Sequence, residues 1–468
     1  MNEQRPSIFS LLKQAILGTE LNFTEGSINR AIFLLSVPMI IEMGMESVFA
    51  VVDIYFVSRL KDNSAVTAVG LTELSLTIIY SIAMGISMGA TALVSRRVGE
   101  KDEKGASIAG VQAIYIGLFF ATIFTVVGFI WSADILRLFG ADEKVVGIGT
   151  GYILWMICGN LTIMLLFLIN GIFRGAGNAA IAMKALVLAN GLNIVLDPVF
   201  IFGLGPIPAM GVTGAAIATN IGRGIGVLLQ LYYLFVGNSN SIVRVNARNM
   251  PLRWDIVGTM LRVSAGATGQ FLISSASWMV LGRIIAHFGT TAVAGYTFAM
   301  RVIVFTILPS FGMANAAATL VGQNLGAGKP DRAETSVWRA GLYNMVFLGL
   351  VMVLFLFVSE PIMRIFTEDV AVIAYGKEAL QVVALGYIFY GYGMVVNQSF
   401  NGAGDTLTPT LISLFGFWFL QIPLAYVLAL KLGWETTGVY AAISIAESLM
   451  AIAGIIIFRR GKWKDIKI

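Results

Sequence analysis

The chain has 468 residues, of which 57% are hydrophobic and only 12% are charged, and its net charge is +5. Soluble domains contain about 25% charged residues, so this composition excludes a soluble fold and predicts a protein of the lipid bilayer. The Lys and Arg residues fall mainly between the hydrophobic runs and form no basic face interleaved with aromatic residues, which argues against nucleic acid as a partner.

Residues 1–30 form a weakly apolar segment followed by polar residues, without the small-residue cleavage site of a signal peptide. We predict a cytoplasmic lead-in with a short interfacial helix there. Hydrophobic runs long enough to cross a bilayer then recur twelve times, which predicts an all-α polytopic membrane protein. The predicted spans of the first half are 31–60, 64–95, 106–130, 148–173, 181–203 and 211–236. Those of the second half are 256–286, 291–322, 339–358, 376–400, 408–430 and 437–458.

An even number of spans places both termini on one side of the membrane, and the distribution of Lys and Arg says which. Segments on the side of the termini hold 20 of these residues, and the opposite segments hold 8. The positive-inside rule therefore predicts cytoplasmic termini, a cytoplasmic linker at 237–255 and a basic cytoplasmic tail at 459–468. We expect the membrane to be a prokaryotic inner membrane. The remaining Arg223, Arg262 and Arg301 lie inside spans, where they are candidate partners for buried acids.

An internal repeat relates the two halves, because adding 227 to a first-half residue number repeatedly gives the same residue type. The matches in this register include Gly85 with Gly312, Gly99 with Gly326, Arg137 with Arg364 and Asn170 with Asn397. Six spans bring the chain back to the side on which it started, so both halves cross the membrane in the same direction. We predict two six-helix lobes, 31–236 and 256–458, related by a parallel pseudo-two-fold axis, with a cavity between them.

The first span carries three acids on one face. At about 100° per residue, Glu46 lies roughly 40° and Asp53 roughly 20° around the helix from Glu42. A carboxylate at the membrane centre costs at least about 2.5 kcal/mol, so this face has to line water, a counter-charge or a cation. We interpret the span as one wall of an ion or substrate path, the alternative being structural pairing with basic residues. Pro38 removes a backbone donor and predicts a hinge.

A second polar stripe occupies span five, where Asn190, Asn193 and Asp197 are spaced i, i+3 and i+7. The stripe ends at Pro198, a second predicted hinge. Carboxylate and amide oxygens suit a proton or Na⁺ and are poor ligands for soft metals. If Asp53 and Asp197 lie close together, their repulsion favours uptake of a proton or cation. The matching second-half positions are apolar, so this site belongs to the first half; the alternative is hydrogen bonding that only joins helices.

The single Cys158 and the single His287 leave no material for a disulfide framework, a Cys/His zinc site or a bis-His haem. The glycine tripeptides at 175–177 and 402–404 lack the preceding strand and the lysine of a phosphate loop. Neither an aspartate-rich motif nor a pair of histidines is present to support an intramembrane enzyme. We therefore expect no cofactor and no enzymatic activity, and we expect an ion gradient as the energy source.

Segments spread over nearly the full chain resemble those of multidrug and toxic compound extrusion (MATE) transporters. They are TEGSI at 24–28, LSVP at 35–38, VVDIYFV at 51–57, FRGAGN at 173–178, NIVLDPVFI at 193–201, GVTGAAIAT at 211–219 and NGAGDT at 401–406. The chain is most similar to the DinF-like branch. The resemblance implies export of organic, cationic or amphipathic compounds by H⁺ or Na⁺ antiport with alternating access. It also implies that Asp53, Asn193, Asp197 and Thr219 form the cation site of the first lobe, and the Na⁺ ligands if Na⁺ is the coupling ion.

Further polar residues in the spans are auxiliary candidates for the cavity. They are Glu42, Glu46, Asn190, Gln270, Arg301 and Glu447. Glu42, Glu46 and Glu447 add negative charge where the family is usually neutral, which favours cationic substrates. Gln270 is the polar group of span seven, where the NorM-like branch carries an acid. We also expect Arg301 to neutralise Asp197 or Glu447 in one conformation, because an unpaired guanidinium is costly at that depth.

The expected partners are small organic substrates and the lipid bilayer, and we expect a monomer. A lipid-linked oligosaccharide flippase of the same superfamily is the alternative function, since it would share the repeat and the cavity. Such a flippase should have a strongly cationic cavity for pyrophosphate, whereas the buried charge predicted here is mainly acidic.

Overall fold

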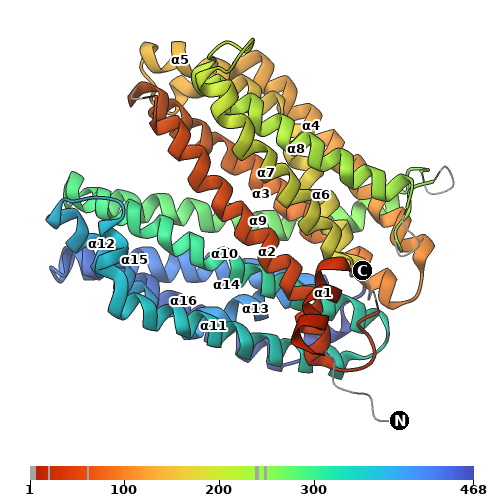
Figure 1. The fold of residues 1–468 in the computed structure, drawn as a ribbon. Helices are drawn as coiled ribbons and strands as arrows, with labels where there is room; N and C mark the ends of the chain where they lie inside the picture. The colour runs from red at the N-terminus through yellow and green to blue at the C-terminus, as the bar shows by residue number, and fades with distance from the viewer. Residues whose placement is uncertain (1–6, 19–21, 61–62, 238–241, 247–249) are drawn as a thin grey trace.

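The structure is built from helices joined by short connections (Figure 1). It is a computed structural model that describes residues 7–18, 22–60, 63–237, 242–246 and 250–468. Within these residues the extended backbone pairs only in an isolated bridge between Leu204 and Ile207. This architecture follows from the apolar sequence, because a helix satisfies its own backbone hydrogen bonds where lipid offers no partners.

The first half of the chain contains a short amphipathic helix followed by the helices of one lobe. They are α1 (Ile8–Leu17), α2 (Ile28–Ser58), α3 (Asn63–Gly99), α4 (Glu103–Leu138), α5 (Glu143–Cys158), α6 (Asn160–Gly175), α7 (Ala179–Phe202) and α8 (Gly211–Phe235). The second half forms the other lobe. Its elements are α9 (Trp254–Ala286), α10 (Thr290–Gly326), α11 (Pro330–Arg364), α12 (Val370–Ala384), α13 (Tyr387–Ala403), α14 (Leu407–Ser413), the π-helix η2 (Leu414–Gln421), α15 (Ile422–Tyr426), the π-helix η3 (Val427–Lys431), α16 (Glu435–Arg459) and the 3₁₀ turn η4 (Lys462–Asp465).

In the described residues, eleven helices are long and apolar enough to span a membrane, or twelve if the bent pair α12 and α13 forms one span. The predicted all-α, twelve-span fold class is confirmed. Two predicted spans are broken: α5 gives way to α6 at Gly159, and α12 meets α13 at an angle of 59°. At the second break Gly386 lies against α16, where a Cβ would approach Ser444 to van der Waals overlap, so the chain bends at a close contact with α16.

The predicted repeat is confirmed by the helix bounds. Shifted by 227 residues, α3 coincides with α10 at both ends, and α12 begins at the position equivalent to the start of α5. Figure 1 shows the two lobes as separate bundles, α2 to α8 above and α9 to α16 below. The lobes meet on the side where both termini lie and diverge towards α5 and α12. We call these the terminal side and the open side.

Contacts between the lobes come from their inner helices: α3 packs against α9 and α10, and α10 packs against α2. Two interlobe hydrogen bonds on the terminal side repeat the internal symmetry. Gln323 Nε2 of α10 donates to the carbonyl oxygen of Gly175 at 3.1 Å, and Arg96 Nη2 of α3 donates to that of Ala403 at 3.4 Å. The donor positions 96 and 323 are equivalent, whereas the acceptors Gly175 and Ala403 differ by one residue from exact equivalence, so the two bonds form a nearly symmetric pair that holds the terminal side together.

The chain after α16, which we call the tail (residues 461–468), crosses from one lobe to the other. Arg96 of the first lobe donates to the carbonyl oxygen of Ile466 at 2.7 Å. Lys464 forms an ion pair with Glu334 of α11 at 2.6 Å, and this hydrogen-bonded contact raises the pKa of the Lys464 ammonium. The tail is therefore fixed to both lobes on the terminal side.

Candidate cation and substrate site

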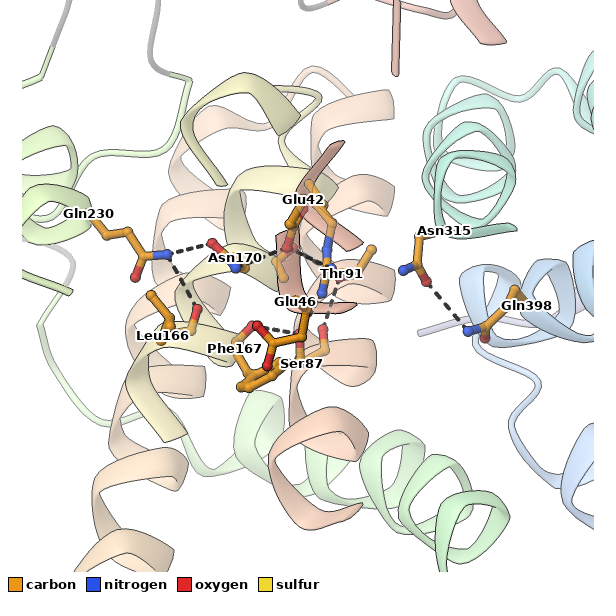
Figure 2. Close-up of polar contacts among 12 residues, drawn as sticks. Glu42, Glu46, Ser87, Thr91, Leu166, Phe167, Asn170, Gln230, Asn315 and Gln398 are labelled. Atoms are coloured by element: carbon orange, nitrogen blue, oxygen red, sulfur yellow. Dashed lines mark hydrogen bonds and ion pairs between the residues drawn. The ribbon is translucent and has the colours of Figure 1, made fainter. Parts of the chain in front are cut away.

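The acidic face of α2 meets basic and amide side chains of the first lobe. Glu42 is 1% exposed, and its Oε1 accepts hydrogen bonds from Asn170 Nδ2 at 2.9 Å and Arg174 Nη1 at 3.2 Å, both on α6. Arg174 Nη2 also donates to Ser87 Oγ of α3 at 3.0 Å, and Gln230 of α8 donates to Asn170 (Figure 2). Glu42 thus belongs to a buried network that joins α2, α3, α6 and α8.

Glu46 lies one turn further along α2 and has its own partners. Asn190 Nδ2 of α7 donates to its Oε2 at 3.2 Å, and Arg223 Nη2 of α8 lies 3.7 Å from its Oε1. The Arg223 guanidinium also lies over the rings of Phe49 and Tyr80, at 5.2 and 5.7 Å from their centroids. Glu42 and Glu46 are therefore both paired with basic residues inside the bundle, which is the structural alternative given above for the acidic face of this span.

Asp53 differs from these two acids. It is 7% exposed, and its carboxylate has no ion pair within 4.0 Å and no hydrogen bond in the described part of the chain. It lies close enough to Asp197 of α7 for the two carboxylates to interact electrostatically. The condition stated for spans one and five, that these two carboxylates lie close together, is therefore met, since α7 packs against both α2 and α8.

Asn193 organises the other members of the predicted cation site. Its Nδ2 donates to Asp197 Oδ1 and to Thr219 Oγ1, each at 3.1 Å, and all three side chains are at most 3% exposed. The bonds use both amide protons of Asn193. Its Oδ1 and the Oδ2 of Asp197 are buried without a hydrogen-bond partner.

This donor set has the chemistry of a site for a proton or a small hard cation. A buried acceptor without a donor costs about 1–3 kcal/mol, and more when it is charged. The acceptors are carboxylate, amide and hydroxyl oxygens, which are the ligands that a hard cation prefers. In the described residues, no group of three or more His, Cys, Asp or Glu side chains could hold a metal ion.

The second lobe has a network of amide side chains instead of an acid paired with an arginine. Asn401, equivalent to Arg174, exchanges hydrogen bonds with Gln270 of α9 at 2.9 and 3.3 Å and donates to Gln398 Oε1 at 2.7 Å. Gln398 in turn donates to Asn315 of α10 at 3.4 Å (Figure 2). Gln270 thus lies in a neutral network. Gln270, Gln398 and Glu447 of α16 line one cavity of this lobe, and Glu447 forms no hydrogen bond with the network in the described residues.

Arg301 on α10 is exposed and forms no ion pair with Asp197 or Glu447 within the described residues. It is close enough to Glu73 of α3 to interact with it electrostatically. The predicted pairing in another conformation stays a prediction. Pro38 and Pro198 both lie inside continuous helices, α2 and α7, and their hinge roles also stay predictions.

Several residues of the site were missed by the sequence analysis. Arg174 was counted among the loop residues but is a buried partner of Glu42 in the last turn of α6. Gln230 and Glu73 lie inside predicted spans and were not considered. The sequence feature that could have identified these residues is a polar side chain within an apolar run. Such a side chain costs free energy in the membrane unless it has a partner.

The comparisons with known proteins agree with this geometry. The MatE family model matches residues 38–199 and 267–427, one match in each lobe and more than half of the chain together. The chain is 24% identical to the probable multidrug resistance protein NorM of Thermotoga maritima over 93% of each protein. It is 24% identical to the multidrug export protein MepA of Staphylococcus aureus, covering 93% of this chain and 94% of that protein. A crystal structure of MATE in the straight conformation superimposes with a TM-score of 0.89 at 27% identity, covering 97% of this chain and 99% of that one. The chain is a multi-pass membrane protein that belongs to the MatE family.

Proposed function

We propose that the chain is a secondary active multidrug exporter, which moves organic, cationic or amphipathic compounds out of the cell in exchange for H⁺ or Na⁺. The observation that supports this most directly is the pair of buried, unpartnered oxygens of Asn193 and Asp197, close to the buried residue Asp53, in one lobe of a repeated fold. The other two acids of α2 already have arginine partners, so Asp53 and Asp197 are the acids left for a mobile cation. The names of the relatives, a multidrug resistance protein and a multidrug export protein, favour drugs over lipid-linked oligosaccharides as substrates.

Alternating access would use the two lobes as rigid bodies. The lobes are joined on the terminal side and diverge on the other (Figure 1). With cytoplasmic termini in a prokaryotic inner membrane, this conformation faces outward. Antiport requires that cation and drug favour different states, so cation binding at Asp53 and Asp197 should weaken the affinity for drug.

The mechanism assigns separate tasks to the side chains. Asn193 positions Asp197 and Thr219 through its two amide hydrogens, which leaves Asp197 Oδ2 and Asn193 Oδ1 to face the cation. Asp53 brings the second carboxylate from α2, the helix that also packs against α10 of the other lobe. Neutralising the two acids removes their repulsion, and α2 then transmits the change to the interface between the lobes.

Transport by inverted membrane vesicles tests the proposal. Uptake of the fluorescent cation ethidium would be followed with a pH gradient and a Na⁺ gradient imposed separately. We expect one gradient to drive uptake and the other to be without effect. Absence of uptake under both gradients, with the protein present and folded in the vesicles, would refute the proposed function.

A further inference from the structure

Glu447 is a carboxylate without a partner in the middle of α16. It makes no hydrogen bond and no ion pair with any residue of the described chain. An ionised group at this depth in a membrane span is costly unless a cation or a proton neutralises it. The cation site described above cannot do so, because that site is in the other lobe.

Glu447 faces a partly open cavity of about 140 Å³ lined by α9, α10, α13, α14, η2 and α16. A second cavity of about 20 Å³ adjoins it, and Glu447, Trp278 and Tyr390 line both. Neither Lys nor Arg is among the described lining residues of the two cavities. The titratable groups facing Glu447 are the hydroxyls of Tyr390 and, at the smaller cavity, Tyr387. No basic side chain of this lobe is thus placed to compensate the carboxylate.

Aromatic rings form much of the cavity wall. Trp278 and Phe271 come from α9, Phe311 from α10 and Phe417 from η2, and the rings of Phe271 and Phe311 lie 6.3 Å apart. Aromatic faces around a carboxylate are the arrangement that binds organic ammonium ions, through cation–π attraction and charge pairing. The wall also carries the amide oxygens of Gln270, Asn397 and Gln398, which are ligands of the kind that an inorganic cation prefers. The aromatic rings beside the carboxylate therefore favour an organic ammonium ion, and not a lack of oxygen ligands.

The equivalent position of the first lobe shows that the fold does not require an acid here. That position is Asn220, one residue after Thr219. Its Nδ2 donates to the carbonyl oxygens of Trp155 and Ala216 at 3.0 and 2.9 Å, and Thr162 donates to its Oδ1 at 3.2 Å. Asn220 is therefore a satisfied structural residue, whereas Glu447 is directed at open volume.

We infer that the cavity at Glu447 is a second binding site, for the head group of a quaternary or tertiary organic ammonium ion. A cavity of about 150 Å³ holds a benzene ring, so the site has room for a trimethylammonium group with a short substituent. Trp278 and Tyr390 supply the aromatic faces, and Glu447 supplies the counter-charge. The inference rests on the proposed function for its role in the cell, as a place where a cationic drug is held within the second lobe.

The test is binding of choline to the purified full-length protein in lipid nanodiscs, measured by isothermal titration calorimetry. The probe for charge recognition is 3,3-dimethylbutan-1-ol, the neutral isostere of choline. We expect choline to bind, the alcohol to bind at least about tenfold more weakly, and Glu447→Gln to weaken choline binding by about tenfold or more. The matched control is Glu378→Gln, an acid of α12 that accepts hydrogen bonds from Thr436 and Thr437 away from the cavity.

Three results would overturn the inference: unchanged choline affinity in Glu447→Gln, equal affinity for choline and the alcohol, or loss of binding in Asp53→Asn alone. If the melting temperature shows that Glu447→Gln does not fold, Trp278→Leu takes its place, with the same expected weakening. No ion gradient is used, so the two proposals fail independently. Glu447-dependent binding without efflux would refute only the proposed function, and efflux without such binding would refute only this inference.

Discussion

Gly99 and Gly326 occupy equivalent positions, and each packs directly against the backbone of the other's helix. A Cβ on Gly99 would overlap the carbonyl oxygen of Gln323, and a Cβ on Gly326 would overlap that of Arg96. Because 99 and 326 are related by the repeat, as are 96 and 323, the contact between α3 and α10 is symmetric. The two helices approach backbone to backbone here because neither residue has a side chain.

Substitution at this contact should separate the lobes. We expect Gly99→Ala to destabilise the closed terminal side by about 1–3 kcal/mol, because the backbones on either side cannot move apart without breaking neighbouring packing. The melting temperature of the purified protein measures this effect. Gly70→Ala is the matched control on the same helix, since nothing lies within 4 Å of a Cβ there. Equal melting temperatures for the two variants would contradict the close contact.

The coupling site gives a second prediction. Asp53→Asn and Asp197→Asn should each abolish ion-driven efflux while leaving a folded protein that still binds drug, because each removes a carboxylate that the cation neutralises. Efflux in inverted vesicles and drug binding in nanodiscs are the two measurements. Glu435→Gln, on the open side at the start of α16, is the control. Full efflux by the double variant would rule out this site and return attention to Glu42 and Glu46.

A third prediction separates structural acids from the coupling site. Arg174→Met leaves Glu42 buried and without its cationic partner, which should cost about 3–5 kcal/mol of stability. The Glu42→Gln, Arg174→Met double variant should recover most of that loss, because no unpaired charge remains. A double-mutant cycle on thermal unfolding measures the interaction. If Glu42→Gln leaves stability unchanged but abolishes ion coupling, then Glu42 belongs to the coupling site.

The orientation in the membrane can be tested with cysteine labelling in a Cys158→Ala background. Lys144 lies at the start of α5 on the open side, and Lys462 lies in the tail on the terminal side. With cytoplasmic termini, a membrane-impermeant maleimide should label Lys144→Cys in intact cells and Lys462→Cys only in inverted vesicles. Labelling of position 462 from outside intact cells would reverse the orientation.

The sequence predicted the features that depend on periodicity and composition. The spans follow from uninterrupted apolar runs, and the repeat was visible because glycine, arginine and asparagine recur in one register. The closeness of Asp53 and Asp197 was only a condition in the reasoning from the residues, and it was the family resemblance that assigned both acids to one cation site. The interpretation of the acidic face required only the energetic cost of polar groups in lipid.

Partners that come from distant parts of the chain were not predictable in the same way. Arg174 is 132 residues from Glu42 and sits at the end of an apolar run, where a basic residue is ordinarily at the membrane surface. The breaks within spans four and ten were also not predicted, because a single glycine does not interrupt the hydrophobic pattern of an apolar run. Only the approach of α16 explains the bend at Gly386.

The attachment of the tail to both lobes has a practical consequence for following the transport cycle. Trypsin cleaves flexible segments after Lys and Arg, and the tail contains Lys462, Lys464 and Lys467. While Arg96 holds the carbonyl oxygen of Ile466, cleavage there should be slow; when the terminal side opens, that bond has to break and the tail becomes a substrate. The rate at which trypsin removes the tail therefore reports how often the terminal side opens. Mass spectrometry measures this rate without a label.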